Sequence, residues 1–245
     1  MMLTGKNILI TGISSGIGRS ITEICIAENA HVWGIARNEE RIEEVKKSCL
    51  FSDHLQTISY DLSIPDYNED YLSTFLPERC DGFVHSAGIS ISKPLQFQEP
   101  EILFETFSIN IISAMKLITL LTERFNYNAS IVFISSVMGL VGQSAKLSYC
   151  ASKGAITAFT RSLALEYTSR KIRVNSILPG VVKTPLFETL MDKLPSESLE
   201  NIYTQHPLGL GEPADIAHLV LFLLSDMSKY INGSLIAVDG GYLAR

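Results

Sequence analysis

The chain has 245 residues, of which 46% are hydrophobic and 19% are charged, which is the composition of an ordinary globular protein of one or two domains. Its formal net charge of −6 disfavours a nucleic-acid-binding protein, because such proteins usually carry a basic stripe. No uninterrupted apolar run reaches the ~18 residues of a membrane span, and the first residues lack a signal-peptide pattern, so we expect a cytoplasmic protein with no nucleic-acid or membrane partner.

Short apolar segments alternate with longer amphipathic ones along the chain. The predicted strands are Lys6–Ile10, Val32–Ala36, Gln56–Ser59, Gly82–His85, Ser130–Ser135, Arg173–Leu178 and Leu235–Val238. The predicted helices are Ile17–Asn29, Glu39–Ser48, Glu101–Phe125, Ser148–Ser169 and Pro213–Leu224. Short apolar strands are typical of parallel strands buried on both faces. The alternation predicts one α/β domain over residues 1–245, a doubly wound Rossmann fold with about seven parallel strands flanked by helices.

The segment 184–207 interrupts this alternation and contains Pro185, Pro195 and Pro207. Long irregular segments in compact domains are often lids or binding loops. Because this one follows the sixth predicted strand, we expect a substrate lid, with an ordinary surface loop as the alternative.

A glycine-rich turn connects the first predicted strand to the first helix. It reads Thr11-Gly12-Ile13-Ser14-Ser15-Gly16-Ile17-Gly18. Glycines permit a tight turn and close approach of the backbone to a phosphate, and the helix N-terminus supplies N–H donors. We therefore predict that this turn binds a dinucleotide, with Ser14 and Ser15 as additional hydroxyl donors.

The residue that ends the second strand indicates which dinucleotide binds. An acidic residue there would bind the ribose 2′-hydroxyl of NAD, whereas this chain has Arg37. A guanidinium can bind a 2′-phosphate through two hydrogen bonds, so NADP(H) is predicted to be preferred over NAD(H), unless Arg37 is a solvated loop residue. Asp61 and Leu62 follow the third strand. Asp61 either faces the adenine amino group or caps the following segment.

Tyr149 and Lys153 lie four residues apart at the start of a predicted helix, so both side chains share one face. A free tyrosine has a pKa of about 10, and a nearby ammonium favours the phenolate. Tyr149 is therefore a candidate general acid and base. Ser136 follows the fifth strand and could hydrogen-bond a substrate carbonyl oxygen; Ser135 is the competing choice.

Together these residues resemble the short-chain dehydrogenase/reductase family, in the branch with chains of about this length. The likeness covers nearly the whole chain and also includes Ala87-Gly88, Asn110, Pro179-Gly180, Thr184 and Val238-Asp239-Gly240-Gly241. The resemblance implies an enzyme that transfers a hydride between a nicotinamide cofactor and a carbonyl or alcohol. We expect NADPH-dependent reduction of a ketone or 3-oxoacyl carbonyl, or the reverse.

The resemblance also implies roles for individual residues. Asn110 would hold a water that hydrogen-bonds Lys153 and belongs to a proton relay. Lys153 would also bind the nicotinamide ribose. Val182 and Thr184 would fix the nicotinamide carboxamide, and Pro179-Gly180 would form the turn that brings them there.

One segment departs from the family pattern. The family commonly has Asn-Asn-Ala-Gly after the fourth strand, whereas this chain has His85-Ser86-Ala87-Gly88. Ala87 and Gly88 are still expected to contact the cofactor. Because His85 and Ser86 can also hydrogen-bond, we expect a change in local geometry and no loss of activity.

Within the family, the chain is most similar to 3-oxoacyl-[acyl-carrier-protein] reductases and general ketoreductases. Acyl-carrier docking in that group uses basic residues beside the active-site mouth. Arg170, next to Lys171, matches one such position, but the other falls near Tyr127, which is not basic. We therefore expect a small-molecule carbonyl or alcohol as the substrate, with an acyl thioester as one candidate.

Assembly and alternatives follow from the same resemblance. The family's equivalents of Glu101–Phe125 and Ser148–Ser169 pack between subunits, so a homotetramer is expected, with a dimer as the runner-up. The four cysteines lack metal-binding spacing, so no metal site is predicted. The alternatives are a non-catalytic NADP-sensing protein and an NAD(P)-dependent alcohol or sugar dehydrogenase. Sugar-nucleotide epimerases are longer, and enoyl reductases have a wider tyrosine–lysine spacing.

Overall fold

The structure is a computed structural model that describes residues 1–64, 68–191 and 196–244. In these residues, seven parallel strands form one sheet in the order β3-β2-β1-β4-β5-β6-β7. The strands are β1 (Asn7–Thr11), β2 (His31–Ala36), β3 (Leu55–Ser59), β4 (Cys80–His85), β5 (Phe125–Ile134), β6 (Arg173–Pro179) and β7 (Leu235–Val238). The strand order reverses between β1 and β4, where sheets of this kind bind ligands. The predicted doubly wound Rossmann fold is confirmed.

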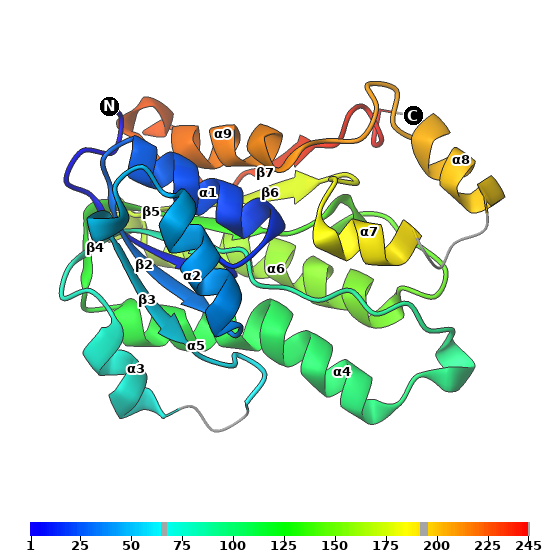
Figure 1. The fold of residues 1–245 in the computed structure, drawn as a ribbon, viewed down its shortest axis with the longest axis horizontal. Helices are drawn as coiled ribbons and strands as arrows, with labels where there is room; N and C mark the ends of the chain where they lie inside the picture. Colours follow the sequence, from blue (N-terminus) through cyan, green and yellow to red (C-terminus); the bar gives the residue numbers. More distant parts are fainter. Residues whose placement is uncertain (65–67, 192–195, 245) are drawn as a thin grey trace.

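Helices cover both faces of the sheet (Figure 1). One face carries α1 (Gly16–Ala27), α2 (Glu39–Ser48) and α9 (Pro213–Leu224). The other carries α3 (Glu69–Phe75), α4 (Pro100–Phe107), α5 (Ser113–Leu121) and α6 (Leu147–Glu166). Two short helices, α7 (Pro185–Met191) and α8 (Ser196–Thr204), lie beyond the carboxyl ends of the strands.

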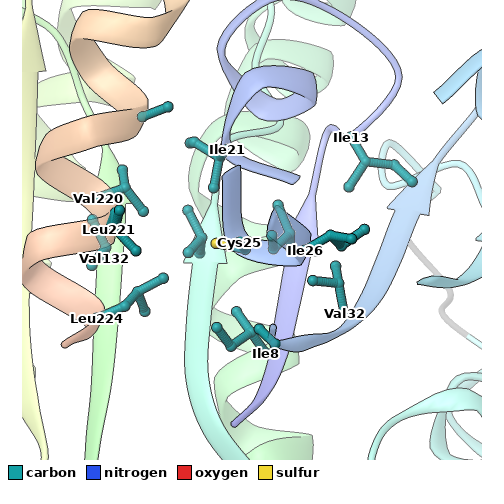
Figure 2. Close-up of a cluster of buried hydrophobic side chains, with 14 of the residues drawn as sticks. Ile8, Ile13, Ile21, Cys25, Ile26, Val32, Val132, Val220, Leu221 and Leu224 are labelled. Atoms are coloured by element: carbon teal, nitrogen blue, oxygen red, sulfur yellow. The ribbon is translucent and has the colours of Figure 1, made fainter. Parts of the chain in front are cut away.

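The core has two halves because alternate residues of a strand point to opposite faces. Ile8 and Ile10 of β1 pack under α1 and α9, whereas Leu9 packs on the opposite side. Figure 2 shows the first half, in which Ile21 and Cys25 face side chains of α9. Full burial of one such aliphatic side chain contributes roughly 1.5–3 kcal/mol, so the two halves hold the helices firmly against the strands.

The predicted helix Glu101–Phe125 is wrong at its carboxyl end. Helix α4 continues through a π-helical turn, Ser108–Ile112, into α5, which ends at Leu121. Phe125 instead begins β5, where it pairs with Cys80 of β4. Single π-helical turns occur frequently at functional sites, and this one contains Asn110.

Other boundaries also differ from those predicted. The helix expected at Ser148–Ser169 is Leu147–Glu166, followed by a 3-10 turn at Thr168–Arg170. Helix α3 was not predicted. The segment 184–207 is largely helical, because it contains α7 and α8, and Pro195 within it lies outside the described residues.

By length and composition alone, the continuous helical stretch Pro100–Leu121, with a mean hydropathy of 1.4, is long and apolar enough to cross a membrane. In the fold, 44% of its apolar window is buried, and Leu117 and Leu121 have no exposed surface. Core helices of soluble domains have the same properties, so this helix is weak evidence for a membrane span.

Candidate active site

One cavity at the carboxyl ends of the strands collects nearly all the residues that the sequence analysis singled out. Its volume is about 430 Å³, in the range of small-molecule binding clefts. The predicted residues that line it are Gly12, Ser14, Ser15, Gly16, Ile17, Gly18, Arg37, Asp61, Leu62, Ala87, Gly88, Ser136, Tyr149, Lys153, Pro179, Gly180, Val182 and Thr184. Asn110 is the exception, because its side chain is fully buried beside the cavity.

Close backbone contacts explain the glycine-rich turn. Gly12 has a φ of +77°, which favours glycine, and a Cβ there would lie 2.8 Å from the backbone nitrogen of Ala87. A Cβ on Gly18 would lie 2.1 Å from the carbonyl oxygen of Gly12. The N-cap residue of α1, Ser15, makes no side-chain capping hydrogen bond. The first N–H groups of α1 therefore remain available to an anion, which fits the pyrophosphate of a dinucleotide.

Among the described residues, two cations line the end of this cavity that is predicted to bind adenosine, called the adenosine end below. Arg37 follows β2, and Arg41 lies in the first turn of α2; both are exposed at the cavity wall. Asn38 caps α2 by accepting a hydrogen bond from the Arg41 backbone at 2.8 Å. Sequence analysis missed Arg41, although its four-residue spacing from Arg37 could have indicated it. The Asp61 carboxylate accepts a hydrogen bond from the Ser63 backbone at 2.9 Å, so it caps the following turn while also lining the cavity.

Ser136 and Tyr149 meet in the other half of the cavity, called the catalytic half below because of the roles predicted for them. Burial raises the pKa of Tyr149, and a hydrogen bond with Ser136 partly offsets this. The Ser136 hydroxyl also accepts a hydrogen bond from the Met138 backbone at 3.1 Å, which fixes its orientation. The Ser135 hydroxyl instead donates to the Lys153 carbonyl at 3.0 Å, within the fold. Of the two serines, Ser136 is therefore the one that faces the tyrosine.

Lys153 lies one helical turn beyond Tyr149. Its Nζ donates to the Ile134 carbonyl at 2.8 Å and lies 5.7 Å from the centroid of the Tyr149 ring. Burial lowers the pKa of Lys153 to about 8. The ammonium is therefore still mainly protonated at neutral pH, and its charge favours the phenolate form of Tyr149.

The π-helical turn directs Asn110 inward rather than to solvent. Its Nδ2 donates to the Ile89 carbonyl at 3.1 Å and to the Ser152 hydroxyl at 2.9 Å, and its Oδ1 accepts from the Ile89 backbone at 2.8 Å. A Cβ on Gly88 would lie 3.3 Å from Asn110 Oδ1 and 3.4 Å from Lys153 Nζ. Gly88 therefore lies between the two polar groups, without a side chain to separate them.

His85 replaces an asparagine of the family pattern and forms a complete hydrogen-bond chain. Its Nε2 donates to the Ile109 carbonyl at 3.1 Å, so Nδ1 must accept from the Thr11 hydroxyl at 3.0 Å. The Thr11 oxygen in turn accepts from the Ala87 backbone at 3.2 Å. Burial lowers the pKa of His85 to about 3, so the ring is neutral and ties β1 to β4.

The turn after β6 brings the remaining predicted residues to the cavity. The backbone nitrogen of Gly180 donates to Val238, and that of Val181 donates to His206 Nε2 at 3.1 Å. Val182 forms a β-bridge with Gly211. These contacts fix the turn that carries Thr184 toward α1.

A lysine that sequence analysis missed also lines the cavity. Lys146 precedes α6 and is buried, with its Nζ 5.9 Å from the centroid of the Tyr149 ring. A single lysine in a loop gives no sequence signal, because only the fold brings it to the tyrosine.

The two candidate acyl-carrier docking positions lie elsewhere. The Arg170 guanidinium donates to the carbonyls of Thr122 and Phe125, and the Lys171 Nζ lies 5.5 Å from the ring of Tyr127. Arg170 and Lys171 lie beyond the carboxyl end of α6, and that helix extends roughly 25 Å past Tyr149. They do not flank the cavity of their own chain, which corrects the expectation that Arg170 lies beside this mouth.

Comparisons with known proteins agree with this geometry. The family model described as enoyl-(acyl carrier protein) reductase matches residues 12–243. A tropinone reductase homologue of Arabidopsis thaliana is 35% identical over 98% of this chain and 93% of its own length. A 3-oxoacyl-[acyl-carrier-protein] reductase of Thermotoga maritima is 32% identical over 98% of this chain and 99% of its own. The solved structure of an angucycline C-6 ketoreductase with bound NADP has a TM-score of 0.91 at 27% identity, over 100% of this chain and 98% of that chain.

The fold and the cavity thus define an oxidoreductase that binds a nicotinamide dinucleotide and acts on a carbonyl or an alcohol. The chain belongs to the short-chain dehydrogenase/reductase family, as its motifs indicated.

Proposed function

We propose that this protein is an NADPH-dependent reductase that converts a ketone or a 3-oxoacyl carbonyl to an alcohol, or catalyses the reverse reaction. The observation that carries the proposal is one cavity with Ser136, Tyr149 and Lys153 in its catalytic half and Arg37 at its other end. The ketoreductase and oxoacyl reductase relatives support it.

In the proposed mechanism, the glycine-rich turn, Lys153 and Thr184 would hold a nicotinamide dinucleotide, which would supply the hydride when bound. Tyr149 donates its phenolic proton to the carbonyl oxygen in reduction and takes it back in oxidation. Ser136 hydrogen-bonds the same oxygen and polarises the carbonyl. The Lys153 ammonium stabilises the phenolate that remains on Tyr149.

Asn110 supports proton return to Tyr149. Both of its amide hydrogens are already used within the fold, so any water that it holds toward Lys153 is bound through an acceptor oxygen. Because Gly88 lies between Asn110 and Lys153 and has no side chain, the path for a proton between these two residues is short.

We propose that α7 is the lid predicted for 184–207. Its first residues, Pro185, Leu186 and Phe187, line the cavity. An apolar lid excludes water from a reaction in which a hydride is transferred.

The experiment is the loss of NADPH absorbance with a panel of neutral ketones, β-ketoesters and 3-oxoacyl thioesters, with the reverse reaction followed on the matching alcohols. The proposal is supported if the protein turns over at least one compound and if excess NADP+ abolishes that turnover. Tight NADPH binding without turnover of any compound would instead indicate a cofactor-sensing protein.

A further inference from the structure

The proposed hydride transfer does not use one buried cation in the cavity. Lys146 has only 9% of its surface exposed, and its Nζ donates to the Ser90 hydroxyl at 2.8 Å. Among the described residues, no carboxylate forms an ion pair with it. Burying an ammonium without a counter-charge is unfavourable, and burial lowers the pKa of Lys146 accordingly. Such a site is therefore stabilised by an incoming anion.

The charges around Lys146 also favour the binding of an anion. Among the described residues that line the cavity, Asp61 is the one acidic side chain, and it follows β3 at the adenosine end. The catalytic half holds two lysines, Lys146 and Lys153, together with the amino end of α6, whose dipole adds positive potential. Only Lys153 has a role in proton transfer. This part of an acidic protein therefore has an unmatched positive charge beside the reacting carbonyl.

We propose that Lys146 and Ser90 bind a carboxylate of the substrate, so that the substrate class is the short oxo acids and the matching hydroxy acids. This inference rests on the proposed function, and it names the substrate class for the same site. An ammonium has three donors, of which Ser90 takes one, leaving two for a carboxylate. Because the Ser90 oxygen accepts from Lys146, its own proton is free to donate to the same carboxylate. The lysine beside the Tyr149 ring then anchors the acid group while the oxo group faces the phenol.

The test measures binding without turnover, because an oxo acid cannot react with an oxidised cofactor. Protein saturated with NADP+ is titrated calorimetrically with pyruvate, acetoacetate and 4-oxopentanoate, and with the primary amide of each. We expect at least one oxo acid to bind at least about 10-fold more tightly than its amide, the effect of one charge-assisted contact. Lys146→Met should remove this preference, and Lys146→Arg should restore part of it.

Lys93→Met is the matched control. Lys93 pairs with Glu99 on the surface, and its backbone donates to Ala145, next to Lys146. This variant should keep the preference of the wild-type protein. Equal binding of acids and amides by the wild-type protein would overturn the inference. So would a Lys146→Met protein that weakens acids and amides alike, because that result indicates a role in tuning Tyr149 or in folding.

Activity measured in parallel separates the two proposals. Turnover of neutral ketones without any carboxylate preference leaves the proposed function standing and overturns the carboxylate site. Lys146-dependent binding of an oxo acid without turnover of any compound supports the carboxylate site and contradicts the proposed function.

Discussion

Replacing Arg37 with aspartate tests cofactor choice, because it reverses the charge at the adenosine end of the cavity. A ribose 2′-phosphate carries close to two negative charges and needs cations around it. Among the described residues, Arg37 and Arg41 are the cations that line this end, and both are exposed, so solvent weakens each contact. We therefore use the lower limit for a charge-assisted hydrogen bond, ~1.5 kcal/mol, or about 10-fold in affinity.

Repulsion between the new aspartate and the phosphate adds a similar factor. Arg37→Asp should thus lower the ratio of kcat/KM for NADPH to that for NADH by about 100-fold. Arg41→Ala should lower it by about 3- to 10-fold, since it removes one contact without adding repulsion. The assay is steady-state kinetics with both cofactors at one fixed substrate concentration.

Arg79→Asp is the control, because it makes the same charge change on an exposed residue before β4, away from the cavity. Its cofactor ratio should equal that of the wild-type protein. A wild-type preference for NADH, or an unchanged ratio in Arg37→Asp, would refute the assignment of Arg37.

Two further predictions concern stability and assembly. The pKa of His85 is lowered to about 3, below the 6.5 of an unfolded histidine, so below pH 6.5 the unfolded state binds a proton that the folded state does not. The free energy of unfolding should therefore fall as the pH drops below 6.5, by at most about 1.4 kcal/mol per pH unit. His85→Asn should flatten this slope between pH 6.5 and 5 in urea unfolding followed by circular dichroism, whereas equal slopes would contradict the neutral buried ring. Exposed apolar side chains on α4 and α6, such as Phe104 and Leu165, support the expected homotetramer, and light scattering that finds a stable, active monomer near 27.1 kDa would exclude it.

The sequence was sufficient where the structure depends on local spacing. The glycines of the first turn and the pair Tyr149 and Lys153 form their geometry within one turn and one helix, so their placement in one cavity agrees with the prediction. Arg37 follows a strand whose end could be identified from its apolar residues. The fold class followed from the alternation of these elements.

The sequence was insufficient where long-range pairing decides the structure. Phe125 continues the apolar pattern of α5, and only its pairing with Cys80 in the sheet makes it the start of a strand. The inward orientation of the Asn110 side chain is fixed by hydrogen bonds to Ile89, from another segment. The role proposed for Lys146 could be inferred only from the fold, which places it over the Tyr149 ring and within hydrogen-bond distance of Ser90.

The most direct test of the account is the turnover number of Tyr149→Phe with the best substrate of the panel, measured together with NADPH affinity. This variant keeps the ring and removes only the phenolic proton donor, and Tyr127→Phe provides the same change on an exposed tyrosine as its control. We predict a fall in kcat of at least ~100-fold, the usual scale for a general acid, with NADPH still bound and the control unaffected. Near-normal turnover in Tyr149→Phe would contradict the central claim that Tyr149 donates the proton.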